Sequence, residues 1–142
     1  MTETNAGSVF LIRIPLLSHD KISGRPLRTF TEGELGVAVL PPVQNGDVLV
    51  LMEDDATGIC VENDILLIRP IPDSAGTQDT GLKPGMLLAW RYGDTLWPVR
   101  VTGLGAEGPE LQEPPEARAE GALRADHLFG YVLAVVHHPT AP

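Results

Sequence analysis

The sequence predicts a mainly β fold, a partly open barrel or sandwich of about seven short strands. Short runs rich in apolar and β-branched residues recur along the chain, and 15 glycines and 13 prolines separate them into pieces too short for typical helices. A length of 142 residues with 43% hydrophobic residues suits one compact domain. We therefore expect a single domain over residues 1–142, with an N-terminal strand and arm (1–34), a β core (35–138) and a tail (139–142).

The first half of the chain predicts four strands. Val9–Ile14 forms the first, and we expect Pro15 to end it because proline cannot donate a ladder hydrogen bond. From Leu16 to Glu34 the chain mixes Ser, Asp, Gly, Pro and charged residues without a period, which predicts an arm or long loop. The next runs lie beside turn-forming residues and predict strands at Val37–Leu40, Asp47–Met52 and Ile65–Arg69.

A hairpin is predicted in the second half of the chain, with strands at Met86–Tyr92 and Thr95–Thr102 joined by Gly93-Asp94. Pro98 falls in its second strand and must lie at an edge, a bulge or a strand end, since it lacks a ladder donor. The two tryptophans that flank the turn could stack a ligand. A cross-strand aromatic pair that packs the sheet is their more ordinary role; they are Trp90 and Trp97.

The last part of the chain predicts one short helix and one strand. Pro114–Asp126 contains Ala, Glu and Arg at helical frequency, but its prolines and Gly121 limit a helix to a turn or two. Leu128–Val136 has the length and composition of a buried strand.

Composition argues against several classes of function. Ten Lys and Arg against 19 Asp and Glu give a net charge of -9, which disfavours direct nucleic-acid binding. Cys60 is the only cysteine, so it cannot form an intramolecular disulfide, and we expect it to be a small buried hydrophobe. No apolar run approaches the roughly 18 residues of a membrane span, and Met1–Ser8 lacks the features of a signal peptide. We expect a cytoplasmic protein with no membrane contact.

The order of these pieces resembles the LexA and UmuD family of self-cleaving serine-lysine peptidases. The matching segments, in order, are Ile14–Ser18, Asp47–Leu51, Glu62–Ile68, Gly93–Arg100 and Phe129–Val136. They are similar to the opening strand, the strands before and after the nucleophile, the lysine hairpin and the closing strand. The resemblance implies the same β fold and places a scissile bond at Ser23-Gly24. Only 13 residues precede Ile14, too few for the helix-turn-helix domain of LexA, so the architecture is closer to UmuD.

The resemblance also implies a serine nucleophile and a neutral lysine base, and neither is found. The nucleophile position falls on one of three residues, Asp54, Asp55 or Ala56, and no serine occurs between Ser23 and Ser74. The lysine position best matches Arg100, with Pro98 and Val99 as alternatives under a shifted hairpin. A guanidinium stays charged and cannot accept the proton of a serine. We therefore expect no catalytic residues, and no metal or cofactor.

Two other functions remain open. Thr57 or Ser23 could be a displaced nucleophile, which would make the chain an active self-processing peptidase. Alternatively, a vacated cleft could bind a small ligand or peptide, and we would expect Asp54, Asp55 and Arg100 to line it.

Three polar runs have simpler interpretations than a site. The carboxylates of residues 53–55 could attract a cation or pair with Arg69 or Arg100, but a solvated acidic turn supplies too few ligands for a hard cation. Ser18-His19-Asp20 and His137-His138 contain catalytic or metal-ligating residue types. Because neighbouring side chains on an extended segment diverge, we expect both runs to be solvated.

The function that these observations favour is a non-catalytic LexA/UmuD-like domain that acts through protein–protein contacts, in stress response or regulation, with an unknown partner. The resemblance further implies a homodimer that pairs through the closing strand. The candidate contact residues are Phe129, Tyr131, Leu133 and Val135.

Overall fold

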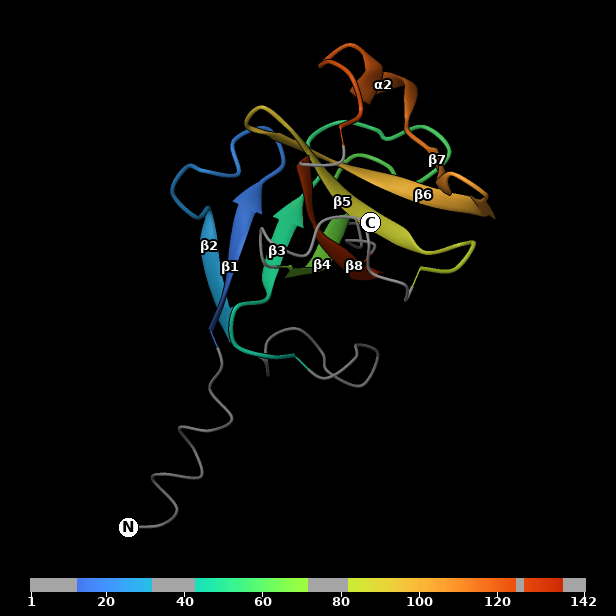
Figure 1. The fold of residues 1–142 in the computed structure, drawn as a ribbon. Helices are drawn as coiled ribbons and strands as arrows, with labels where there is room; N and C mark the ends of the chain where they lie inside the picture. The colour runs from blue at the N-terminus through green and yellow to red at the C-terminus, as the bar shows by residue number, and fades with distance from the viewer. Residues whose placement is uncertain (1–12, 32–42, 72–81, 125–126, 137–142) are drawn as a thin grey trace, which may run out of the picture.

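A computed structural model describes residues 13–31, 43–71, 82–124 and 127–136. Within these ranges the chain forms eight strands and one short helix (Figure 1), namely β1 (Arg13–Ser18), β2 (Arg28–Thr31), β3 (Val48–Leu51), β4 (Ile65–Pro70), β5 (Leu87–Tyr92), β6 (Thr95–Gly105), β7 (Gly108–Gln112), α2 (Pro115–Arg118) and β8 (Leu128–Val136). All strands join one sheet in the order β2-β1-β3-β4-β8-β5-β6-β7, and only β1 and β3 pair in parallel. The predicted mainly β fold is confirmed, as an open sheet rather than a closed barrel.

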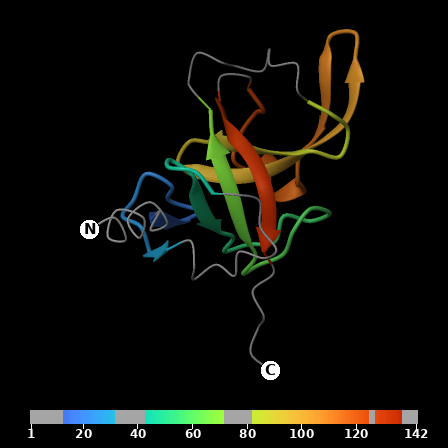
Figure 2. The same ribbon diagram turned by 90° about the horizontal axis from the view of Figure 1, so that it is seen from below.

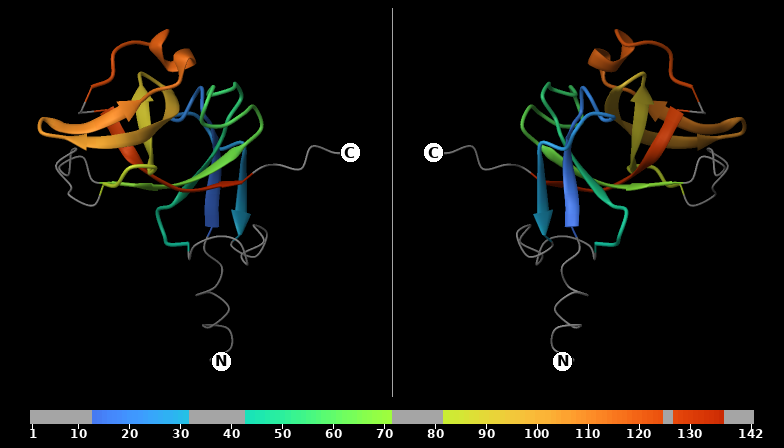
Figure 3. Two further views of the ribbon diagram at one scale, coloured as in Figure 1. Left: turned by 90° about the vertical axis from the view of Figure 1, so that its right-hand side faces the viewer. Right: turned by 90° about the vertical axis from the view of Figure 1, so that its left-hand side faces the viewer.

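The sheet changes direction around β8. In Figure 1, β1 and β3 stand upright, whereas β5, β6 and β7 cross the view at a steep angle to them. Figure 3 shows the β6–β7 hairpin reaching away from β1 and β2. Figure 2 shows β8, in red, running beside β4, in green. Two bulges in β8 accompany the bend: Leu133 is an extra residue opposite β4, and Phe129 is an extra residue opposite β5. Bulges bend a strand and increase its twist.

Two apolar clusters pack on opposite faces of the sheet, because alternate residues of β3 and β4 point to opposite sides. Leu49 and Leu67 belong to the small cluster, which also contains Ile14, Leu16 and Val43. The large cluster lies on the other face and includes Val50, Leu66, Ile68, Leu88, Trp90, Leu96, Trp97 and Val99. Burying each aliphatic side chain of this kind contributes about 1.5–3 kcal/mol. We refer to these groups below as the large cluster and the small cluster.

Gly130 allows β8 to approach the end of β4 closely. A Cβ atom placed there would lie 2.8 Å from the Cα of Pro70 and closer still to the carbonyl oxygen of Arg69. Any side chain at this position would therefore force two paired strands apart. The glycine of the closing strand has a packing role.

The predicted hairpin is confirmed, with Gly93 and Asp94 between β5 and β6. Trp90 and Trp97 lie directly opposite each other, and both are buried in the large cluster, so they form the cross-strand pair that packs the sheet. Pro98 also meets its prediction, because β7 pairs with β6 only from Arg100 onward, so among the described strands none pairs with that side of Pro98.

The prediction of an arm or loop from Leu16 to Glu34 was wrong for residues 16–18 and 28–31, whereas the opening strand that the family resemblance gives, Ile14–Ser18, lies within β1. Strand β1 continues through Pro15 to Ser18 instead of ending at the proline, and β2 lies within the predicted arm. Pro15 is tolerated because its pairing partner belongs to the edge strand β2, while the parallel pairing with β3 starts one residue later, at Leu16. Strand β7 was also not predicted.

Two elements near the end of the chain have the predicted positions. Helix α2 has four residues, within the predicted turn or two, and β8 matches its predicted bounds. The prediction that this strand is buried was wrong, because every residue of β8 except Gly130 is half-buried. The predicted strand at Val37–Leu40, residues 9–12 and the pair His137-His138 lie outside the described residues.

Candidate functional site

The loop between β3 and β4 carries the positions where the family resemblance places a nucleophile. Two backbone hydrogen bonds close its base: the N–H of Met52 donates to the carbonyl of Asp64 at 2.8 Å, and that of Asn63 donates to Met52 at 2.7 Å. Farther out, Ala56 and Cys60 pair as an antiparallel bridge. Asn63 has a φ of 77°, a conformation that asparagine tolerates better than most residues. Backbone hydrogen bonds therefore hold the loop both at its base and farther out, at the bridge between Ala56 and Cys60.

None of the three candidate positions presents a hydroxyl or thiol. Asp54 is exposed. The Oδ1 atom of Asp55 accepts a hydrogen bond from the N–H of Glu62 at 2.8 Å, so this carboxylate braces the loop. Ala56 is fully buried in the large cluster. The loop therefore holds two carboxylates and a core methyl group where a nucleophile would be needed.

Arg100 reaches this loop from β6. Its Nη2 atom donates to the carbonyl oxygen of Gly58 at 3.2 Å. Within the described part of the chain Arg100 forms no ion pair, so it does not pair with the acidic turn. Arg69 is bonded to Asp47. The two lysines, Lys21 and Lys83, are exposed and lie outside the loop.

Thr57 is joined to helix α2. Its hydroxyl donates to one carboxylate oxygen of Glu116 at 2.6 Å, and its N–H donates to the other at 3.0 Å. The hydroxyl bond is the main reason that the pKa of Glu116 lies below its ordinary value; the backbone bond from Thr57 acts in the same direction, and partial burial opposes both. A carboxylate with a lowered pKa is a poor general base. The geometry anchors the loop but does little to activate the hydroxyl.

A cavity of about 400 Å³ opens beside this loop, lined by Asp55, Thr57, Gly58, Ile59, Cys60, Val61 and Asp64. Of the three residues expected around a vacated cleft, Asp55 alone is part of this wall. Burial, followed by the negative charges of Asp64, Asp55 and Glu116, raises the pKa of the Cys60 thiol to about 12. The thiol stays protonated near neutral pH and is no nucleophile. The predicted buried role of Cys60 is confirmed, since its exposed fraction is 6%.

His19 is buried, with an exposed fraction of 1%, and the prediction of a solvated segment was wrong for this residue. Strand β1 runs beside β3 as far as Ser18, and the N–H of His19 donates to Leu51 at 3.0 Å, which carries the imidazole inward. The Nδ1 atom accepts the N–H of Glu53 at 3.0 Å, and the ring meets Trp97 edge to face, with centroids 5.0 Å apart. No local pattern in the sequence indicates this burial, because it depends on the pairing of β1 with β3.

The run Ser18-His19-Asp20 is no catalytic triad, as its neighbouring positions predicted. The hydroxyl of Ser18 donates to the carboxylate of Glu53, while Asp20 accepts from the hydroxyl of Thr95 at 3.3 Å. The Nε2 atom of His19 lies 3.9 Å from a carboxylate oxygen of Asp54 and has no hydrogen-bond partner among the described residues. The three side chains therefore point to different partners. Ser18 and His19 contact the acidic turn of residues 53–55, whereas Asp20 contacts β6.

The candidate cleavage site Ser23-Gly24 is attached to the β5–β6 turn. The N–H of Ser23 donates to Oδ1 of Asp94 at 3.0 Å, and the N–H of Ile22 donates to the Asp94 carbonyl at 3.1 Å. Hydrogen bonds from the side chain and then the backbone of Ser23 lower the pKa of Asp94 below its ordinary value. The N–H of Gly24 donates back to Lys21 at 3.0 Å. The segment is therefore fixed on the hairpin.

The four candidate dimer residues of β8 are all half-buried, but they are divided between the two clusters. Phe129, Tyr131 and Val135 pack against the large cluster, whereas Leu133, the bulge residue, packs against the small one. One backbone edge of β8 pairs with β4 from Gly130 to Val136, whereas the other pairs with β5 only from Leu128 to Val132. Among the described residues, the second edge of residues 133–136 has no partner strand, so a dimer contact through β8 has this edge as well as the two sheet faces available.

In the described ranges, no three or more His, Cys, Asp or Glu side chains are grouped to hold a metal ion. The described residues also contain no helix with the length and apolar character needed to cross a membrane. Neither a family model nor a curated protein nor a solved structure matches the chain.

Proposed function

We propose that this chain is a non-catalytic domain of the LexA/UmuD-like kind, which acts through protein–protein contacts as a homodimer. One observation carries the proposal: the positions that the family resemblance gives to the serine and the lysine hold Asp54, Asp55 or the buried methyl group of Ala56, and the charged guanidinium of Arg100, which is bonded to Gly58. Peptide cleavage by a serine needs a hydroxyl and a neutral base within hydrogen-bond reach. Neither group is supplied by these positions.

The contacts of the two hydroxyls proposed as displaced nucleophiles support the same function. The hydroxyl of Thr57 donates to Glu116, whose pKa is lowered and whose carboxylate is therefore a weak base. Ser23 is bonded to Asp94, a carboxylate whose pKa is lowered as well. Each hydroxyl is hydrogen-bonded to a carboxylate with a lowered pKa, which takes up a proton less readily than an ordinary carboxylate does.

Incubation of the purified chain at alkaline pH, with and without a RecA filament, tests the absence of cleavage. We expect one intact species of 15.2 kDa by mass spectrometry at every time point. An active LexA-family protein, cleaved in parallel, verifies the conditions. A new fragment that ends at Ser23 would contradict the proposal, and loss of that fragment in Thr57→Val would identify the displaced nucleophile.

A further inference from the structure

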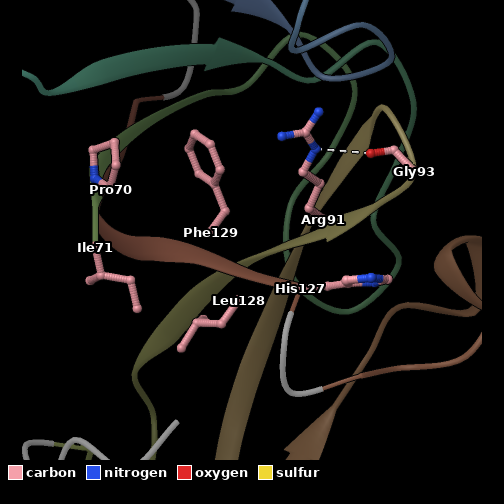
Figure 4. A pocket seen from close by; sticks show the side chains of 7 residues that line it. All are labelled: Pro70, Ile71, Arg91, Gly93, His127, Leu128 and Phe129. Carbon is pink, nitrogen blue, oxygen red and sulfur yellow. Dashed lines mark hydrogen bonds between the residues drawn. The ribbon is translucent and has the colours of Figure 1, made fainter. Parts of the chain in front are cut away.

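A second cavity, of about 500 Å³, lies at the opposite end of β4 from the loop that holds Ala56. Its size falls within the roughly 300–1,000 Å³ of small-molecule sites. Apolar walls come from the end of β4 and the start of β8, and two nitrogen-bearing side chains complete it (Figure 4). The main lining residues are Pro70, Ile71, Leu128, Phe129, Arg91 and His127.

Hydrogen bonds hold the walls of this cavity in place. The N–H of Ile71 donates to the carbonyl of Phe129 at 3.1 Å, which joins the two apolar walls just beyond the last pair of β4 and β8. Phe129 is the bulge residue of β8 opposite β5, so its side chain departs from the regular alternation of the strand. The bulge lies in the sheet and the hydrogen bond follows directly after it, so both apolar walls are held by the protein's own backbone contacts.

Arg91 gives the cavity its charge. Its Nε atom donates to the carbonyl of Gly93 at 2.9 Å, and Nη2 lies 3.5 Å from Oδ1 of Asp94. These contacts orient the guanidinium, and Figure 4 shows it facing the ring of Phe129 across the cavity. A guanidinium has five N–H donors in a planar fork that matches a carboxylate. The contacts above occupy one edge of that fork.

We propose that this cavity binds a small organic monoanion with an apolar, preferably aromatic, body. The carboxylate contacts Arg91, and the body lies against Phe129, Leu128 and Ile71. One permanent cation matches one negative charge, whereas a phosphate or a dicarboxylate would bring more charge than Arg91 balances beside Asp94. This proposal does not rest on the proposed protein–protein function, although Phe129 is also one of the four candidate dimer residues of β8.

The test is an NMR titration of the full chain with phenylacetate and, in parallel, with 2-phenylethylamine, which has a similar body and the opposite charge. We expect phenylacetate to cause saturable shifts at Ile71, Leu128 and Phe129, and the amine to cause none. Arg91→Gln should weaken phenylacetate binding about tenfold or more, because it removes a charge-assisted bond. Arg118→Gln removes the same charge from an exposed residue of α2 and should leave the affinity unchanged.

Three results would overturn the proposal: no saturable shift with the wild-type chain, equal binding of the amine, or an unchanged affinity in Arg91→Gln. If that variant fails to fold, Arg91→Lys replaces it. Lysine keeps the charge but loses the planar fork, so phenylacetate should bind this variant more weakly than the wild type and still more tightly than the amine. The comparison of the two ligands on the wild-type chain requires no variant at all.

Discussion

Asp47 is a buried acidic residue, with an exposed fraction of 2%. Its two oxygens accept from Nε and Nη2 of Arg69, each at 2.9 Å, and Oδ2 also accepts the N–H of Gln44 at 2.9 Å. The bond from Asp47 raises the pKa of Arg69 above its ordinary value. Bidentate pairs of this kind are among the stronger hydrogen bonds in proteins. One carboxylate thus joins the turn before β3 to strand β4.

Asp47→Asn should lower the free energy of unfolding by about 2–4 kcal/mol, because it leaves the guanidinium beside a neutral amide in a mostly buried place. The exposed fraction of the Arg69 side chain, 33%, keeps the loss below that of a fully buried pair. Asp54→Asn removes the same charge from a side chain that is 71% exposed and should change stability by less than about 0.5 kcal/mol. Urea unfolding at neutral pH measures both, and equal losses would count against the pair.

At the scale of single residues, the sequence predicted burial where it follows from the residue type, as for Cys60 and for the cross-strand pair Trp90 and Trp97. It did not predict the partners of Arg69 or the burial of His19. Both depend on which strands are neighbours, and the parallel pairing of β1 with β3 leaves no local pattern in the chain. A residue can indicate burial, but its partner is set by the topology.

At the scale of elements, the strands that sequence predicted are those with a strong apolar run bounded by turn residues, β3 to β6 and β8. Strands β2 and β7 were missed because both are edge strands with mostly polar, exposed residues, so their alternation carries little apolar signal. The link between the β3–β4 loop and α2 was also beyond prediction. Thr57 and Glu116 are 59 residues apart.

Thr57→Val tests that link through the pKa of Glu116. The folded-state pKa of this carboxyl is lowered, so its contribution to stability is present above the ordinary value of 4.5 and is lost as pH falls through the folded value. Without the hydroxyl, the pKa should rise toward 4.5, because that bond is the largest cause of the shift. Carbon-detected NMR titration of the carboxyl measures it.

Thr102→Val is the matched control for this titration. The hydroxyl of Thr102 donates to the carbonyl of Glu110 rather than to a carboxylate, so the pKa of Glu116 should not change. A Glu116 pKa that is the same in Thr57→Val as in the wild type would show that the loop is not held to α2 by this bond.

At the scale of the whole molecule, the proposed dimer has a restricted set of surfaces. The sheet ends at β2 and β7, and β8 lies between β4 and β5, which covers one edge of β8 only from Leu128 to Val132, so among the described strands the backbone of residues 133–136 is paired on the β4 side alone. Its side chains are only half-buried on both faces, although the strand is central. A central strand normally has at least one face covered, which makes each face of β8 a candidate contact surface.

The bulge at Leu133 makes these two faces separable by mutation. Leu133 packs toward the small cluster and Val135 toward the large one, and a two-fold symmetric contact centred on β8 uses one face. We expect sedimentation equilibrium to give twice the 15.2 kDa of one chain, and one of Leu133→Glu and Val135→Glu to dissociate the dimer while the other leaves it intact. Leu104→Glu, at an apolar residue 59% exposed on β6, is the control and should have no effect. A 15.2 kDa species at every concentration would contradict a dimer through β8. Equal dissociation by all three variants would contradict it as well, because a contact on one sheet face should be lost in only one of the two β8 variants.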